Sequence, residues 1–181
     1  MTLTKRGRRV IAASAFVLVL IMIVTVAGLL LKQGAGKNTA KSAATGATVS
    51  MGNLKWHVNG AFRAQELNGS DGPIKAKGSF IVVDMSLTNT ANNKITIDPT
   101  AVAVVDKDKH VYKADKNATA SQAKVYNGEP IISLFQATLA PKTATRVTAV
   151  FPIGAASSHL KLKFIGAKVG AAQDLLIDIG F

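Results

Sequence analysis

The sequence predicts an all-β protein, an antiparallel β-sandwich, preceded by one N-terminal transmembrane helix. First, apolar and polar side chains alternate after Met51, which is the period of half-buried strands. Second, residues 10–31 form an uncharged apolar run that is long enough to cross a bilayer. Third, the 181 residues include no cysteine, which excludes a disulfide scaffold, a cysteine nucleophile and a lipid-modified cysteine.

The N-terminus is predicted to anchor the chain in the cell membrane as a single-pass protein. As a helix, residues 10–31 span about 33 Å, which matches the hydrocarbon core of a bilayer. The basic tail of residues 1–9 is expected in the cytoplasm and the C-terminal domain outside, because Lys and Arg are denser on that flank. A cleaved signal peptide is the alternative, but the run exceeds the usual apolar length of about 7 to 15 residues, which favours a signal anchor.

Residues 32–50 are predicted to form a flexible linker, because they are mainly Gly, Ala, Ser, Thr and Lys. The alternative is an exposed first strand near Thr48, which affects only the last few of these residues. A flexible chain of this length has an r.m.s. reach of about 24 Å. Positive charge is concentrated in this N-terminal part, since residues 1–50 contain seven Lys and Arg and no Asp or Glu. The net charge of +12 therefore overstates the charge of the remaining domain, which has 15 basic and 10 acidic residues.

Residues 51–181 are predicted to form the sandwich domain. Leu54 and Trp56 alternate with polar residues, and in the longest run, residues 80–89, the odd-numbered positions from 81 to 87 form one apolar face. Phe80 and Val82 lie on the opposite face, so the first half of that face is expected to be covered. Clusters of Asn, Asp, Gly and Pro separate the runs, and one short helix is expected within 114–124. The other apolar runs are residues 95–97, 101–105, 110–112, 131–135, 145–151, 160–164 and 174–179.

Residues 78–112 contain a long strand ending in Asn, a short strand ending in Asp-Pro, and a strand that leads into an acidic turn and a Tyr. Together with LAPKTATRVTAVFPI at 139–153 and the two closing strands, this pattern resembles the bacterial domain-of-unknown-function 4352 family. The resemblance implies an immunoglobulin-like β-sandwich tethered outside the cytoplasmic membrane, without established catalytic residues. Most members are lipoproteins with a cysteine, whereas this chain has none, so a lipoprotein-specific role does not transfer.

No metal or cofactor site is predicted. His57, His110 and His159 are scattered and lack the spacing of common ligand pairs, so we interpret them as surface residues. Asp106 and Asp108 alternate with lysines that repel a cation, which favours a solvated hairpin tip over a calcium loop.

No catalytic residues are predicted, so the chain is not expected to be an enzyme. The sequence has no G-x-S-x-G motif and no phosphate-binding Gly-rich loop between a strand and a helix. Two S-x-x-K spacings lack the accompanying motifs of a penicillin-binding type of site, which indicates chance.

Lysines gather around the turn near residue 107, and Lys161 and Lys163 share one strand face. Nucleic-acid binding is not expected, because the domain has only two Arg and few aromatics for stacking. These lysines could attract an anionic cell-surface polymer or lipid headgroups. The competing explanation is that they provide solubility and protect strand edges from pairing.

The sequence thus predicts a non-catalytic binding or accessory module at the cell envelope, whose partners are the membrane and an envelope protein or anionic polymer. A structural subunit of a membrane-embedded envelope or secretion-type assembly is the alternative, and an enzyme acting on envelope polymers ranks third. Scaffolds present function on loops, so partner contacts are expected at two of them. The residues predicted for these contacts are Asn68, Asp71, Lys107, Lys109, Lys113 and Lys116.

Overall fold

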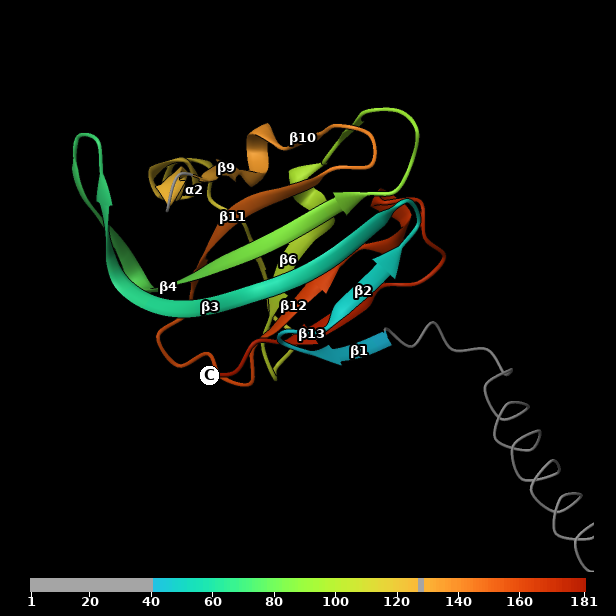
Figure 1. The fold of residues 1–181 in the computed structure, drawn as a ribbon. Coiled ribbons are helices and arrows are strands. Elements are labelled where there is room, and N and C mark those ends of the chain that lie inside the picture. The colour runs from blue at the N-terminus through green and yellow to red at the C-terminus, as the bar shows by residue number, and fades with distance from the viewer. Residues whose placement is uncertain (1–40, 127–128) are drawn as a thin grey trace, which may run out of the picture. The chain divides into compact units, whose positions relative to one another are not determined.

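The computed structural model describes residues 41–126 and 129–181, and in this part of the chain two β-sheets stack into a sandwich (Figure 1). The all-β prediction is therefore confirmed. The six-stranded sheet has the order β2 (Thr48–Met51), β3 (Leu54–Gly69), β4 (Gly72–Asn89), β11 (Ala144–Ile153), β9 (Glu129–Ser133) and β8 (Lys124–Tyr126). The five-stranded sheet has the order β1 (Lys41–Ala44), β13 (Leu175–Asp178), β12 (Lys161–Phe164), β6 (Val102–Val105) and β7 (Val111–Lys113).

Short elements complete the fold. A two-stranded sheet joins β10 (Thr138–Leu139) to β5 (Ile95–Thr96), and the expected short helix is α2 (Lys116–Gln122). Three 3₁₀ turns are η1 (Pro99–Ala101), η2 (Leu134–Gln136) and η3 (Gly166–Lys168). The Asp115 side chain caps α2 by accepting a 2.7 Å hydrogen bond from the backbone N–H of Ala118, which is why the helix begins there.

Most strand pairs are antiparallel, as predicted, but two pairs are parallel. Strand β1 runs parallel to β13, and β9 runs parallel to β11. The short segment between β1 and β2 moves the chain from one sheet to the other, and Gly46 within it has a φ of 88°. A left-handed backbone of that kind suits a glycine, which has no Cβ to clash.

The predicted linker over residues 32–50 is wrong in its second half, because β1 and β2 lie within it. Its small polar residues resemble a tether, but Val49 pairs with Trp56 of β3 and its side chain is only 8% exposed. Pairing with the edge of an existing sheet satisfies the backbone and overrides the local composition. Residues 32–40, the predicted span at 10–31 and the tail at 1–9 lie outside the described residues. Within 41–126 and 129–181, no helix is long and apolar enough to cross a membrane.

The sandwich core is formed by the alternating residues that the sequence identified. Leu54 and Trp56 of β3 and the odd-numbered positions 81 to 87 of β4 are at most 2% exposed. Across the core, the Trp56 ring lies 4.4 Å from that of Phe164 on β12, measured between centroids. A second cluster forms on the opposite face of β4, where Phe80 and Val82 pack with Ala118 of α2. The expected cover over that face is therefore the helix.

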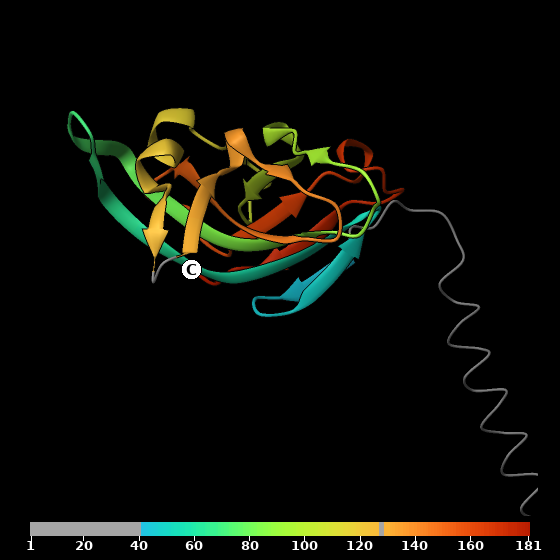
Figure 2. The same ribbon diagram turned by 45° about the horizontal axis from the view of Figure 1, so that its top comes forward.

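Strands β3 and β4 are longer than the sequence indicated, and their shared end curves away from the sandwich beside α2 (Figure 2). The pairing of β3 with β4 shifts register between Val58 and Gly60 and again between Ala64 and Glu66. Each shift interrupts the alternation of side chains. For that reason the sequence pattern of residues 60–79 does not read as a simple half-buried strand.

Candidate functional site

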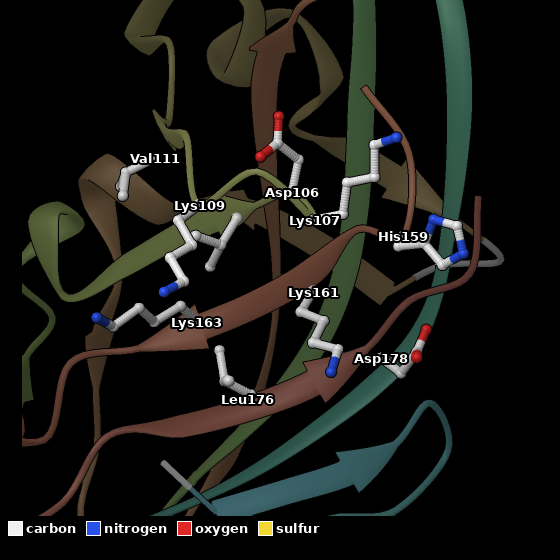
Figure 3. A pocket seen from close by; sticks show the side chains of 10 residues that line it. Asp106, Lys107, Lys109, Val111, His159, Lys161, Lys163, Leu176 and Asp178 are labelled. Atoms are coloured by element: carbon white, nitrogen blue, oxygen red, sulfur yellow. The ribbon is translucent and has the colours of Figure 1, made fainter. Parts of the chain in front are cut away.

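A groove of about 800 Å³ lies on the outer face of the five-stranded sheet, over β7, β6, β12 and β13 (Figure 3). Four lysines line it: Lys107 and Lys109 from the turn between β6 and β7, and Lys161 and Lys163 from β12. Apolar side chains from three strands lie among them, namely Val105, Val111 and Leu176. Asp106, His159 and Asp178 complete the lining.

The alternation of β12 places its lysines in the groove. Leu162 and Phe164 point into the core and are 0% exposed, so Lys161 and Lys163 must point outward from the same strand. In the pairing register, Lys161 stands between Val105 of β6 and Asp178 of β13. The lysine pair therefore occupies the middle of a sheet and not its edge, which removes edge protection as the reason for these two charges.

The turn that presents Lys107 and Lys109 is organised by Asp106, whose side chain is only 3% exposed. Its Oδ1 accepts hydrogen bonds of 2.9 Å from the backbone N–H groups of Asp108 and His110. Its Oδ2 lies 2.9 Å from Nδ1 of His110 and accepts a 2.9 Å hydrogen bond from the Tyr112 hydroxyl. Lys109 has a φ of 67°, so the turn uses a left-handed backbone position at the groove.

These contacts shift the pKa values of the Asp106 carboxyl and the His110 imidazole. Burial of Asp106 raises the pKa of its carboxyl, but hydrogen bonds from His110 and Tyr112 outweigh burial and lower the pKa to about 2. The hydrogen bond to Asp106 in turn raises the pKa of the His110 imidazole above its ordinary value of 6.5. At neutral pH, Asp106 is therefore an anion whose charge is directed into the turn.

Ligand atoms of Asp106, Asp108 and His110 lie within 4.8 Å of one another, a spacing that a metal ion could use. However, Oδ1 of Asp106 already accepts two backbone hydrogen bonds, and Oδ2 already contacts Nδ1 of His110 and the Tyr112 hydroxyl. The lone pairs of both oxygens are therefore occupied. The geometry thus favours the hairpin tip that the sequence indicated, and the expected absence of a metal stays a prediction.

The lysines of the groove differ in their partners. Lys163 forms a 2.9 Å ion pair with Asp174, and this hydrogen bond is the main reason that the pKa of the Asp174 carboxyl is lowered. Within residues 41–126 and 129–181, no ion pair engages Lys107, Lys109 or Lys161. Asp178 lies opposite Lys161, and its Oδ1 accepts a 3.0 Å hydrogen bond from the backbone N–H of Gly180.

The structure separates the six residues that the sequence predicted for partner contacts. Lys107 and Lys109 line the groove, and the strand period places Lys113 on the same face of β7 as the groove residue Val111. Lys116 instead begins α2. The two remaining residues lie near the β3–β4 turn, where Asp71 lines a separate cavity of about 810 Å³ beside α2 and Asn68 pairs with Pro73.

The sequence did not connect β13 with the lysines. Leu176 and Asp178 reach the groove only because β13 pairs with β12, and no sequence signal gives that register. The shared face of Lys161 and Lys163 was visible in the strand period, but its meeting with Lys107 and Lys109 requires the pairing of β12 with β6.

Solved structures of the same fold come from several bacteria. The yjhA protein of Bacillus subtilis is 14% identical, with a TM-score of 0.52 over 77% of this chain and 99% of that one. MPT63, a secreted protein of Mycobacterium tuberculosis, is 11% identical, with a TM-score of 0.53 over 78% of this chain and 99% of its own. An uncharacterized β-sandwich protein of Clostridium difficile is 9% identical, with a TM-score of 0.51 and coverage of 80% and 97%.

A comparison with curated proteins gave no match. The sequence does match a family described as a domain of unknown function (DUF4352), over residues 43–173. That match begins inside β1 and ends just before β13, so it covers nearly all of the sandwich. The resemblance found in the sequence is confirmed, and the chain belongs to the DUF4352 family.

Proposed function

We propose that the protein is a non-catalytic binding module, held at the outer face of the cell membrane by a helix at residues 10–31. The observation that carries the proposal is the lysine-lined groove on the outer face of the five-stranded sheet. The uncharged run at 10–31 supports the anchor, and the basic tail before it supports a cytoplasmic N-terminus. An extracytoplasmic domain is also consistent with the secreted protein that shares the fold.

The lining of the groove supports binding over catalysis. Its residues include no Ser, Thr or Cys, so the groove lacks a hydroxyl or thiol nucleophile. Its buried carboxylate, Asp106, is committed to the hydrogen bonds of the turn. An exposed groove with several cations can attract an anion by charge alone, without any covalent step.

Protease treatment of intact cells that express the full chain with a C-terminal tag tests the location. We expect external protease to remove the tag while a cytoplasmic marker stays intact. A matched control, Leu20→Lys/Ile23→Lys, places two charges in the predicted span, which costs about 2.5–3.5 kcal/mol for each charge at the centre of a helix. That variant should keep the tag protected. Protection of the wild-type tag to the same extent as the cytoplasmic marker would overturn the proposed topology.

A further inference from the structure

We propose that the lysine-lined groove binds a linear polyanion without nucleobases, whose backbone carries repeated phosphate groups. This inference rests on the proposed function, because it takes the groove to be the binding site of the proposed module. It gives the binding module a ligand class and assigns the recognition to Lys107, Lys109 and Lys161, with Lys163 in a secondary role.

The groove gathers lysines whose charge no ion pair offsets. Among the described residues, Lys107, Lys109 and Lys161, like most surface lysines of the domain, have no carboxylate within ion-pair distance, but these three lie together in one groove. The three come from two segments more than fifty positions apart in the sequence, which the pairing of β6 with β12 brings together. Concentrated like charge of this kind disfavours folding unless counter-ions or a ligand relieve the repulsion.

The arrangement of the groove favours a chain over a single ion. Lys161 and Lys163 stand two residues apart on one strand, which separates their backbone positions by about 6.6 Å. Lys109 extends toward Lys163 from the neighbouring turn, and Lys107 of the same turn also lines the groove (Figure 3). Several separate anionic groups can therefore be engaged at once. Between the charges, Val105 and Leu176 offer apolar contact to the carbon atoms that join those groups.

The side-chain chemistry favours phosphate without bases. Lysine binds phosphate as a point charge, and no arginine lines the groove to hold a planar carboxylate in a bidentate pair. Proteins that bind single-stranded nucleic acid stack bases on aromatic rings. None of the lining residues is Phe, Tyr or Trp, so the groove lacks that platform.

Two carboxylates limit the positive charge and provide variants that should bind more tightly. Asp174 holds Lys163 in an ion pair, and Asp178 stands opposite Lys161. Each carboxylate also accepts a backbone hydrogen bond, from Gly166 and Gly180 respectively, which the amide oxygen of Asn can replace. Asp174→Asn and Asp178→Asn thus remove negative charge while they retain the local structure.

Isothermal titration calorimetry of the full chain in neutral detergent, with inorganic polyphosphate of defined length as the probe, tests the proposal. The variant Lys107→Gln/Lys109→Gln/Lys161→Gln should bind about a hundredfold more weakly, because each lysine at an anionic surface contributes roughly fivefold. The matched control, Lys55→Gln/Lys77→Gln/Lys94→Gln, removes the same charge outside the groove and should bind within about threefold of wild type. Asp178→Asn and Asp174→Asn should each tighten binding severalfold, and circular dichroism should show that every variant is folded.

Absence of polyphosphate binding by the wild-type chain would overturn the proposal, and so would an equal loss in the groove variant and its control. Polygalacturonate and a single-stranded oligonucleotide serve as the other arms. If polygalacturonate binds more tightly than polyphosphate, the groove recognises polycarboxylates. If the oligonucleotide binds more tightly than polyphosphate, the groove recognises nucleic acid. Either result contradicts the proposed phosphate polymer. The location test is independent: a chain exposed on cells without polyphosphate binding keeps the proposed function and loses only this ligand.

Discussion

The Tyr112 hydroxyl donates a 2.9 Å hydrogen bond to Oδ2 of Asp106, and this bond ties strand β7 to the turn that carries Lys107 and Lys109. The same hydroxyl lies 2.7 Å from Oγ of Ser157, in the segment that leads to β12. One phenol thus links the two segments that supply the groove lysines. The position of the charges therefore depends on a hydrogen-bond network beneath them.

Tyr112→Phe should lower the free energy of unfolding by about 1–2 kcal/mol, because it removes a donor from the buried, ionised Asp106. Urea denaturation followed by circular dichroism measures the change. Ser157→Ala is the control, since it removes the neighbouring hydroxyl and leaves the bond to Asp106 in place. The importance of the Asp106 bond would be refuted by equal losses in the two variants.

Acid should weaken the fold through Asp106. The pKa of its carboxyl falls from the ordinary 3.8 to about 2 on folding, so its stabilising contribution is complete above pH 4 and is lost as the pH falls toward 2. Unfolding of wild type and Asp106→Asn between pH 2 and pH 6 measures this contribution. The stability difference should shrink toward pH 2, and a difference that is constant across the range contradicts the lowered pKa.

Alkaline pH should weaken the same turn through His110. The pKa of this imidazole is raised above 6.5 in the folded protein, so its contribution is complete below pH 6.5 and is lost as the pH rises through the folded value. The stability difference between wild type and His110→Gln should therefore decrease between pH 6 and pH 8.

The two titrations belong to one pair, and a double-mutant cycle separates them from other groups. In an Asp106→Asn background, His110→Gln should lose the pH dependence of its effect, because the anion that raises the pKa of the imidazole is gone. A pH dependence that persists in this background would mean that other charges, such as Asp108, are the main cause.

Gly166→Ala should destabilise the protein by about 1–3 kcal/mol, because the added Cβ would collide with the backbone carbonyl oxygen of Gln173. Backbone on both sides leaves no flexible side chain to move aside. Gly60→Ala is the control, since a Cβ there meets nothing within 4 Å. Thermal unfolding compares them, and a Gly166→Ala variant as stable as the control would show that the loop before β13 can shift.

The sequence predicted the sandwich core well, because burial imposes a period that single residues display. Trp56 and the odd-numbered face of β4 were identified from alternation alone. The candidate site was predicted only in part, because a groove depends on pairing between distant strands. Lys109 and Lys161 meet through the register of β6 with β12, and contacts of such sequence separation leave no local pattern.

The first strand of the domain, β1, was missed for a different reason, and a strand near Thr48 was considered only as an alternative to the linker. Residues 41–50 have the composition of a tether, and what makes them strands is the unpaired edge of β3 and of β13. The backbone of β2 pairs with that of β3, and Val49 adds one buried side chain. The composition of a segment indicates only its own conformational preference. Strands β1 and β2 form because β13 and β3 offer edges with which they pair.

The contact between Trp56 and Phe164 also gives the protein a natural optical reporter. Trp56 is the single tryptophan of the chain, it is 0% exposed, and among the described residues its indole Nε1 has no hydrogen-bond partner. An indole in such apolar surroundings emits at short wavelength and shifts to the red when water reaches it. Because Trp56 belongs to one sheet and Phe164 to the other, intrinsic fluorescence follows the separation of the two layers without any added label.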